Sequence, residues 1–395
     1  MRVALVSSGL VPLPPIKGGA VEEYVYQLSR HLRRLGVDAV AIDAKWNGID
    51  VETDNINGAE ILRIPVRPPT LNTKRSIAME FQFGKTANKY LNKEDFDVIH
   101  ANTAWAGFAL AINRKRSHSF VYTCHNPLWP EDKVHLGERV VRLVEGFTMR
   151  ASNAVVALNK TMYRAIVKKA SVNGDKAVII PNGVDADYFK PGLRYDEFLS
   201  KFNLEEGNYI LFVGRVSPEK GVHLLLKAFS YIAQESVHVK LVIAGPLTSS
   251  FSASGTSPYA SAVVEYAKRR LPGRIIFTGA VNRDELRVLY SNAHLFVLPS
   301  LAEAFGMVLL EAMASGIPPI GSTAGGIPDV ISDGVNGLLF KKGEWKDLAT
   351  KMLMLINDEN HRNKLAAKAR ETAVEKYSWQ FIASKIKEIY VAVLR

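Results

Sequence analysis

The chain has little of what marks disulfide-rich, membrane-spanning or secreted proteins. Its 395 residues include one cysteine, Cys124, which excludes an intramolecular disulfide and a cysteine-based zinc site. It contains no run of about 18 apolar residues, so no membrane-spanning helix is expected. The first strand-like stretch reaches only to about Ser7, which is too short for the hydrophobic region of a secretory signal. We therefore expect a cytoplasmic protein.

Nucleic-acid-binding and dehydrogenase signatures are also missing. We find no zinc finger, basic zipper or RNA-binding aromatic signature, and no G-x-G-x-x-G fingerprint after the first strand. The net charge of +11 is nevertheless high. It is compatible with solvated surface charge, with attraction to polyphosphate, or with peripheral contact with the anionic inner face of a membrane. We expect no nucleic-acid partner, and the charge alone does not choose among the others.

Alternating strand-like and helical patterns predict an α/β protein with two doubly wound parallel sheets. The length also favours two domains of roughly 180–200 residues each. Proline, glycine and acidic residues place the hinge near residues 181–203. In the first half we predict strands over 3–8, 39–43, 60–65, 97–102, 120–124, 154–158 and 178–181, and helices over 20–35, 77–91, 134–149 and 161–170. In the second half we predict strands over 208–213, 241–244, 275–278, 295–298, 319–321 and 337–340.

Two glutamates in residues 299–316 are the strongest functional signal. Glu303 belongs to a loop after an apolar strand, whereas helical spacing places Glu311 on the helix that follows. Eight helical residues rise about 12 Å, so the two carboxylates are too far apart to share a proton. They suit a ligand held at two places, such as a nucleotide sugar held at its ribose and its hexose. The alternative is a solvated helix with two ordinary glutamates.

A second signal is a pair of cations after the strand that ends at Val213. Arg215 and Lys220 lie five residues apart on one loop, where they can bracket a diphosphate. Such charges stabilise a nucleoside-diphosphate leaving group as its negative charge develops. The alternative is a surface turn in which Glu219 pairs with Lys220.

Two features of the first half are compatible with a ligand site. Gly18 and Gly19 precede a helix, where the backbone can approach an anion closely; the alternative is a flexible loop before a helix start. His125 follows a strand and is expected at the edge of a cleft, with a structural histidine as the alternative, whereas His100 is equally explained as a strand cap and is not assigned a role.

Together these motifs resemble those of retaining glycosyltransferases of family 4 (glycosyltransferase group 1). The resemblance covers nearly the whole chain, from the glycine pair to Trp379. It implies a GT-B fold, in which two Rossmann-like domains face a central cleft. Residues 1–185 would form the acceptor-side domain and residues 186–377 the nucleotide-sugar domain. The C-terminal helix, residues 378–395, would cross back to the first domain.

The resemblance also implies roles for single residues. Glu311 would bind the ribose hydroxyls, Glu303 the donor hexose near its anomeric centre, and Arg215 and Lys220 the diphosphate. His125 would contact the hexose by its side chain or backbone. The remaining donor-binding residues implied are Gly18, Gly19, Phe305, Gly306, Met307 and Val308.

The implied reaction moves a hexose from a UDP- or GDP-linked donor to an acceptor hydroxyl, in glycan, glycolipid or glycoconjugate synthesis. A front-face mechanism without metal or cofactor is expected. The acceptor would be a glycan, a lipid-linked molecule or a small molecule, and residues 43–73 and 126–135 would select it. Two rivals remain: a nucleotide-sugar epimerase of GT-B fold, which needs no acceptor, and a non-catalytic basic binding module.

Overall fold

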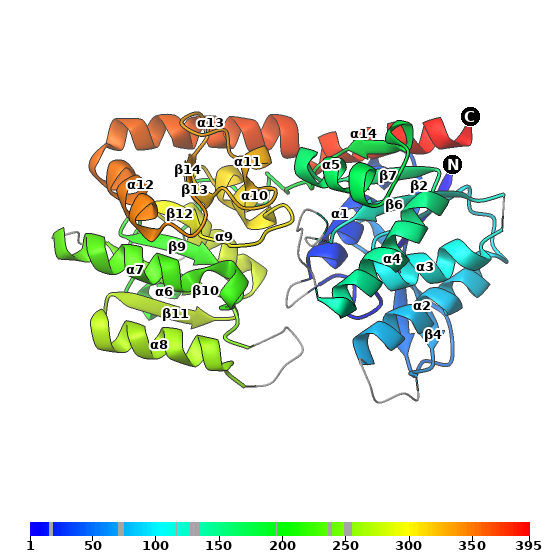
Figure 1. Cartoon of the computed structure of the whole chain (residues 1–395), viewed down its shortest axis with the longest axis horizontal. Helices are drawn as coiled ribbons and strands as arrows, with labels where there is room; N and C mark the ends of the chain where they lie inside the picture. Colours follow the sequence, from blue (N-terminus) through cyan, green and yellow to red (C-terminus); the bar gives the residue numbers. More distant parts are fainter. Residues whose placement is uncertain are drawn as a thin grey trace. The chain divides into compact units, whose positions relative to one another are not determined.

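The computed structural model describes residues 1–15, 19–69, 75–115, 117–126, 129, 135–194, 196–235, 239–248 and 255–395. The chain forms two compact units (Figure 1). Unit 1 consists of residues 1–182 and 379–395, and unit 2 of residues 183–378. Among the residues described, no helix combines the length and apolar character needed to cross a membrane.

The described residues of unit 1 form an eight-stranded sheet in the order β3-β4-β2-β1-β5-β6-β7-β8. Its strands are β1 (Arg2–Val6), β2 (Asp38–Trp46), β3 (Glu52–Ile56), β4 (Ala59–Val66), β5 (Val98–Ala101), β6 (Ser119–Cys124), β7 (Ala154–Ala157) and β8 (Ala177–Ile179). All seven strands predicted in this half are confirmed. The prediction missed β3, the one strand of this sheet that pairs antiparallel, because it lies at the sheet edge and is largely polar.

Helices cover both faces of this sheet. They are α1 (Ala20–Arg34), α2 (Arg75–Leu91), α3 (Ala104–Asn113), α4 (Leu136–Ala151), α5 (Lys160–Lys169) and α14 (Trp379–Leu394). Val3, Leu5 and the buried Trp379 belong to one core cluster, formed between the sheet and helices α1 and α14. Helices α2, α3 and α4 pack side by side (Figure 1). Because crossovers between parallel strands in one sheet are right-handed as a rule, we place these three helices on the face opposite to α1 and α14. The prediction missed α3, which is apolar on nearly every side and so shows no helical period.

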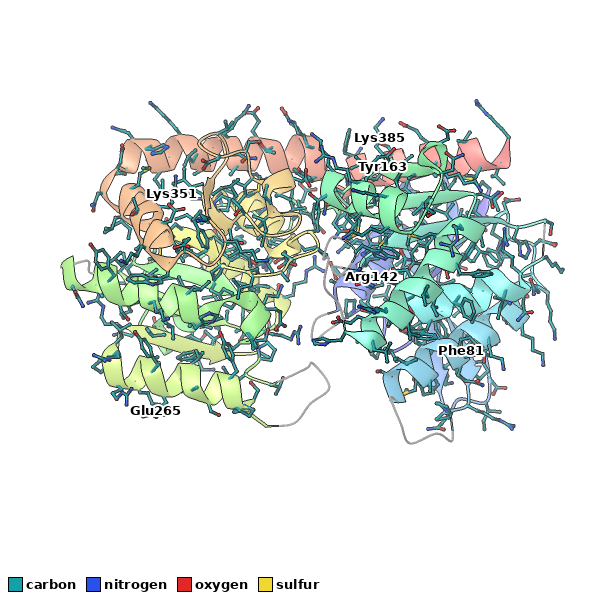
Figure 2. All side chains as sticks on the ribbon, viewed as in Figure 1. Phe81, Arg142, Tyr163, Glu265, Lys351 and Lys385 are labelled. Carbon is teal, nitrogen blue, oxygen red and sulfur yellow. The ribbon has the colours of Figure 1, made fainter. Side chains whose placement is uncertain are left out.

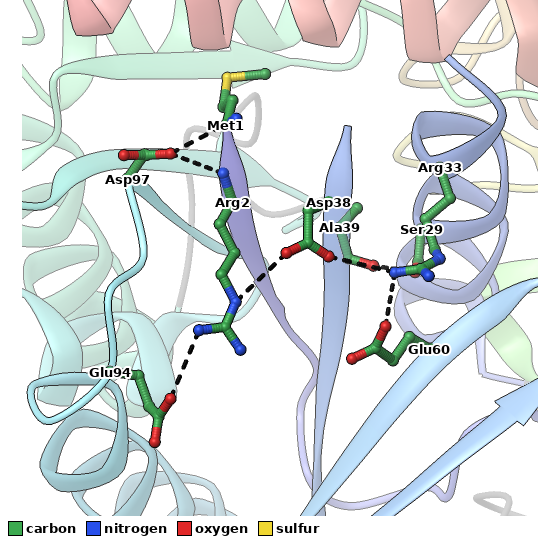
Figure 3. A network of polar contacts seen from close by, with 9 residues as sticks. All are labelled: Met1, Arg2, Ser29, Arg33, Asp38, Ala39, Glu60, Glu94 and Asp97. Atoms are coloured by element: carbon green, nitrogen blue, oxygen red, sulfur yellow. Dashed lines mark hydrogen bonds and ion pairs between the residues drawn. The ribbon is translucent and has the colours of Figure 1, made fainter. Parts of the chain in front are cut away.

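A polar network holds the N-terminal ends of β1 and β2 (Figure 3). The Arg2 guanidinium forms ion pairs with Asp38 and Glu94, each at 3.5 Å. Arg33 of α1 pairs with Glu60 at 2.7 Å and with Asp38 at 3.4 Å. Each exposed pair contributes little to stability by itself. The network lies at the edge of the sheet opposite to the one where ligands bind in such folds.

In the described residues of unit 2, six parallel strands form a sheet in the order β11-β10-β9-β12-β13-β14. The strands are β9 (Tyr209–Val213), β10 (Lys240–Ala244), β11 (Ile275–Gly279), β12 (Leu295–Leu298), β13 (Pro319–Ser322) and β14 (Leu338–Phe340). All six were predicted. The helices are α6 (Asp196–Lys201), α7 (Val222–Ile232), α8 (Pro258–Arg270), α9 (Arg283–Ser291), α10 (Met307–Ala314), α11 (Ile327–Val330), α12 (Trp345–Asn357) and α13 (Glu359–Tyr377).

The strand order of unit 2 explains where its functional loops meet. From β9 the chain proceeds outward to β10 and β11, then returns so that β12 pairs with the other side of β9. The switch point between β9 and β12 is where open α/β sheets bind ligands. The loops after these two strands carry Arg215, Lys220 and Glu303, and they leave the sheet at the same edge.

Candidate functional site

The loops after β9 and β12 are joined by their backbones. The Leu301 amide donates to the Glu219 carbonyl at 2.7 Å. Gly221 adopts a left-handed conformation with φ +67°, and a Cβ at this position would lie 2.1 Å from the Pro299 carbonyl oxygen. Glycine is therefore required for this close approach. The contact fixes Lys220 beside the loop that carries Glu303.

Lys220 and Glu303, which the sequence placed on separate motifs, form an ion pair. The Lys220 ammonium donates to Glu303 Oε2 at 2.6 Å, and Ser300 Oγ donates to the same oxygen at 3.3 Å. Only 22% of the Lys220 side chain and 12% of the Glu303 side chain are exposed. An ammonium has three N–H donors, so a lysine bound to one carboxylate retains the capacity to bind phosphate oxygens.

Glu219 holds the other cation of the loop. Its Oε1 accepts from Arg215 at 3.1 Å and from the Ser217 hydroxyl at 2.6 Å. Burial raises the pKa of Glu219, but the Ser217 hydrogen bond and the charges of Arg215 and Lys220 outweigh burial, so its pKa lies below the ordinary value. The carboxylate stays ionised and orients the guanidinium. The local turn therefore uses Glu219 to position Arg215, while Lys220 bonds to Glu303.

Glu311 lies on α10, as the spacing predicted, and has a different partner from Glu303. The buried Tyr290 of α9 donates its hydroxyl to Glu311 Oε2 at 2.9 Å. Burial and the charge of Glu311 raise the pKa of Tyr290 well above its ordinary value, so the phenol remains a donor. Tyr290 thus orients the carboxylate that we assigned to the ribose. No motif in the sequence pointed to this tyrosine.

The segment between the two glutamates starts helix α10. Gly306 precedes the helix with φ +89°, and the amides of Met307 and Val308 lie in its first turn. The first amides of a helix have no partner within the helix, so they are available to an anion. The Phe305 side chain is buried against Tyr377, with ring centroids 6.2 Å apart. Phe305 therefore offers a ligand its backbone alone.

Gly325 lies against the backbone of Glu303. Its φ is +52°, and a Cβ there would lie 1.8 Å from the Glu303 carbonyl oxygen. That oxygen accepts the Gly326 amide at 3.1 Å. Sequence reasoning missed this contact, which joins the loop after β13 to the loop after β12. Gly325 thus permits the position that Glu303 occupies.

We expect Gly325→Ala to destabilise unit 2 and to impair activity, because the added Cβ must displace the Glu303 backbone. The matched control is Gly334→Ala, at φ +74°, where an added Cβ would have no atom within 4 Å and would introduce only the left-handed strain of about 1–2 kcal/mol. Denaturant unfolding should show a larger loss for Gly325→Ala by at least about 1 kcal/mol. Equal losses in the two variants would contradict the role given to Gly325.

In unit 1, Gly19 precedes α1 with φ +138°. A Cβ at Gly19 would lie 2.6 Å from Oε2 of Glu22, a buried carboxyl that accepts from the Ser8 hydroxyl. Burial raises the pKa of Glu22. Gly18 lies outside the described residues. The glycine at position 19 therefore leaves room for a buried acid at the start of α1 that the sequence did not single out.

His125 follows β6 as a neutral imidazole. Its ring meets the edge of Tyr24 with centroids 4.8 Å apart. Burial lowers the pKa of His125 to about 3, so the ring is uncharged at neutral pH. Within the part of the chain that the structure describes, its buried Nε2 atom has no hydrogen-bond partner. This nitrogen can exchange a hydrogen bond with a ligand hydroxyl, but it does not supply a positive charge.

Glu145 of α4 organises the chain that follows His125. It is fully buried, and its Oε2 accepts from Asn126 Nδ2 at 2.9 Å and from Trp129 Nε1 at 2.6 Å. Its Oε1 accepts from the Tyr122 hydroxyl at 2.7 Å. Burial raises the pKa of Glu145, although these hydrogen bonds oppose the shift. Sequence reasoning missed Glu145 because its partners lie 16 to 23 residues away, on other elements.

A second buried network links the C-terminal helix to β6. His100 Nδ1 lies 2.6 Å from the Tyr390 hydroxyl of α14, and Nε2 lies 2.7 Å from Thr123 Oγ1. A neutral imidazole provides one donor and one acceptor, which matches these two hydroxyls. Burial, together with the nearby His125, lowers the pKa of His100 to about 3. His100 therefore connects two elements through its side chain, rather than simply capping a strand.

We expect His100→Gln to reduce the loss of stability that unit 1 undergoes as the pH falls. Between pH 6.5 and 3 the unfolded chain binds a proton at His100 that the folded chain does not, so stability falls as the pH falls, by about 1.4 kcal/mol per pH unit. The variant should lose this contribution. Tryptophan fluorescence during denaturant unfolding at pH 6, 5 and 4 reports mainly unit 1, which holds four of the five tryptophans. The free energy of unfolding is plotted against pH for both variants. If His100→Gln had the same slope as the parent chain and as the control His361→Gln, a neutral His100 would be contradicted.

The structure thus brings Lys220 and Glu303 into direct contact, and it gives Arg215 and Glu311 supporting partners within unit 2. Gly19 and His125 belong to unit 1. Among the residues described, no group of three or more histidine, cysteine or acidic side chains is arranged to hold a metal ion.

Two α/β sheets, parallel except for β3, with cations and carboxylates beside the switch point of the second sheet, match a glycosyltransferase of the GT-B fold. Two family models match the chain: Glycosyltransferase Family 4 over residues 18–188 and Glycosyl transferases group 1 over residues 194–372. The chain therefore belongs to the family 4 glycosyltransferases (glycosyltransferase group 1), whose members use nucleotide-sugar donors. The resemblance and the fold predicted from the sequence are both confirmed.

Known proteins align with the chain along its whole length. An uncharacterized glycosyltransferase of Methanocaldococcus jannaschii is 27% identical over 407 residues, covering 99% of this chain and 98% of that protein. Sucrose-phosphate synthase of Thermosynechococcus elongatus has a TM-score of 0.83 at 21% identity, covering 100% of this chain and 99% of that one. Anabaena HepE in complex with UDP-glucose has a TM-score of 0.74 at 22% identity, covering 99% of this chain and all of that one. At these identities the two structures show the fold alone.

Proposed function

We propose that this glycosyltransferase moves a hexose from a UDP- or GDP-linked donor to an acceptor hydroxyl with retention of the anomeric configuration. The observation that carries the proposal is the 2.6 Å contact between Lys220 and Glu303. In a nucleotide sugar the diphosphate and the hexose are directly bonded. A cation and a carboxylate in contact therefore match the two parts of one donor.

In the proposed complex each group has a separate task. Arg215 and Lys220 bind the diphosphate and stabilise the charge that develops on it as the bond to the anomeric carbon breaks. Glu303 accepts hydrogen bonds from hexose hydroxyls and stabilises the positive charge on the ring. Glu311, oriented by Tyr290, accepts from the ribose hydroxyls, and the first amides of α10 face the phosphate or the nucleoside. Gly18, Gly19 and His125 remain predicted contacts to the same donor.

The proposed chemistry is a front-face displacement. The acceptor oxygen forms a bond to the anomeric carbon on the face from which the phosphate leaves, and the hydroxyl proton moves to the departing phosphate oxygen. This route needs no protein nucleophile behind the anomeric carbon, and the sequence suggests none. We propose that it runs without a metal ion, with Arg215 and Lys220 supplying the positive charge.

The test is product analysis by NMR with UDP- and GDP-linked hexoses carrying ¹³C at the anomeric position. With a panel of glycan, lipid-linked and small-molecule acceptors, we expect a new glycoside with the donor's anomeric configuration. Without an acceptor, we expect slow hydrolysis of the donor and no isomerised donor. Inverted product would overturn the front-face mechanism, and isomerised donor in the absence of acceptor would favour the epimerase instead.

A further inference from the structure

Helix α4 presents an apolar stripe to solvent. Leu136, Val140, Leu143 and Phe147 recur at intervals of four, three and four residues, and so lie on one face of the helix. Their exposed fractions are 78%, 44%, 71% and 43%. We call these four residues the α4 stripe.

The polarity of this helix differs from that of an ordinary surface helix, which turns its apolar face to the core and its charged face to water. Here the buried face combines Glu145 and Thr148 with the apolar Met149, while the four large apolar residues of the α4 stripe are exposed. Contiguous exposed apolar surface of this kind marks an interaction site.

The apolar surface continues onto the neighbouring helices. The Phe147 ring lies 5.4 Å from the Phe108 ring of α3, which in turn lies 6.3 Å from the Phe81 ring of α2, measured between centroids. Ile112 near the end of α3 is 43% exposed. Phe81 and Arg142, labelled in Figure 2, mark α2 and α4 on this side of unit 1.

Basic residues outnumber acidic ones on the three helices that form this surface. Helices α2, α3 and α4 contain three acidic residues, Glu80, Glu138 and Glu145. Glu80 accepts from the Trp105 and Ala106 amides, Glu138 accepts from the His135 amide, and Glu145 is buried. Each of the three carboxyl groups thus accepts a hydrogen bond within the protein, and Glu145 is buried away from the surface. In contrast, Lys85, Lys89, Lys115 and Arg139 are exposed on or beside these helices.

We propose that the α4 stripe, with the basic residues around it, is a peripheral docking surface for an anionic lipid bilayer. The stripe enters the boundary between headgroups and acyl chains, and the cations meet the lipid phosphates. A second copy of this chain is a poorer occupant, because a two-fold contact would bring the same cations together. A nucleic-acid duplex presents phosphates and base edges to a protein surface, which do not match a stripe made mainly of aliphatic side chains. This proposal goes beyond the transfer reaction and does not depend on which donor is used.

The first test is sedimentation of the full chain with vesicles of phosphatidylcholine, either alone or mixed with phosphatidylglycerol. We expect binding to the anionic vesicles that weakens as salt is added. Leu143→Gln should lower the partition coefficient about tenfold, and Arg139→Gln about fivefold. The matched control is Ile49→Gln, at a residue of the same unit that is 89% exposed, which should bind like the parent chain.

The second test locates the inserted residue. Cys124 is buried, so a cysteine introduced at Leu143 can be labelled selectively with an environment-sensitive fluorophore. On adding anionic vesicles we expect a blue-shifted emission for Leu143→Cys and no shift for Ile49→Cys. The parent chain treated with the same reagent gives the background.

Several results would overturn the proposal. One is equal binding of the parent chain, Leu143→Gln and Ile49→Gln, which would place the contact elsewhere. Another is no binding to anionic vesicles at low salt. A third is concentration-dependent dimerisation that Leu143→Gln abolishes, which would assign the stripe to a second copy of the chain.

Discussion

Replacing Lys220 by alanine lowers the rate of hexose transfer at least about a hundredfold, the cost expected when a group that stabilises developing charge is removed. The change also deprives Glu303 of the cation that it now contacts at 2.6 Å. Glu303 then keeps the longer hydrogen bond from Ser300 but loses the charge that holds it beside the proposed diphosphate site. Both effects act on the reacting centre, so kcat/KM for the donor is the measurement.

The control for this prediction is Lys227→Ala, at an exposed lysine on helix α7. It removes the same charge from the same unit without touching the loops after β9 and β12. We expect it to retain the parent rate within a factor of about two, and both variants to show a single folded population by circular dichroism. If Lys220→Ala transferred hexose at a rate within about threefold of the parent rate, the proposed role of Lys220 in donor binding would be contradicted.

The second large effect is on stability. Glu145→Ala lowers the free energy of unfolding of unit 1 by roughly 3–5 kcal/mol, because it leaves several buried donors without an acceptor and opens a cavity. Tyr122, Asn126 and Trp129 would all lose their bonds to the carboxyl. Tryptophan fluorescence during urea unfolding measures the change. We also expect lower activity at temperatures where the variant is folded, because Asn126 directly follows His125.

Two further variants separate hydrogen bonding from packing. Glu145→Gln keeps the shape of the side chain but replaces one acceptor oxygen by an NH₂ group. Its free energy of unfolding should therefore fall by about 1–3 kcal/mol, less than that of the alanine variant. Arg139→Ala changes an exposed residue of the same helix and should be nearly neutral. A neutral Glu145→Ala would show that the carboxyl does not hold this part of the chain.

The sequence placed the unit 2 residues on the elements that the structure shows, because the signals for those elements are local. Glu303 and Glu311 are placed by a strand, a loop and a helix that follow one another, and Arg215 and Lys220 by the loop after a single strand. The alternation of strands and helices also predicted both sheets. The order of the strands in the sheet decides which loops are neighbours. The sequence pattern does not predict this order, and in particular it does not predict that β12 pairs with β9.

What the sequence could not predict depends on partners from distant elements. The bond from Tyr290 to Glu311 joins two helices, and the Glu145 network joins a helix, a strand and a loop. From the sequence, Glu145 is indistinguishable from an exposed glutamate on a helix, whereas the structure shows that it is buried. In the same way, the apolar residues of α4 follow the period of a core-facing helix, and only the structure shows that this face is exposed.

The central claim is that unit 2 binds the diphosphate of a nucleotide-sugar donor through Arg215 and Lys220. Isothermal titration of the purified chain with UDP, GDP and ADP, and then with their hexose conjugates, tests it most directly. We predict one molecule of UDP or GDP bound per chain, with affinity reduced in Lys220→Ala and unchanged in Lys227→Ala. Absence of binding to every nucleotide at millimolar concentration, or equal affinity in both variants, would contradict the account.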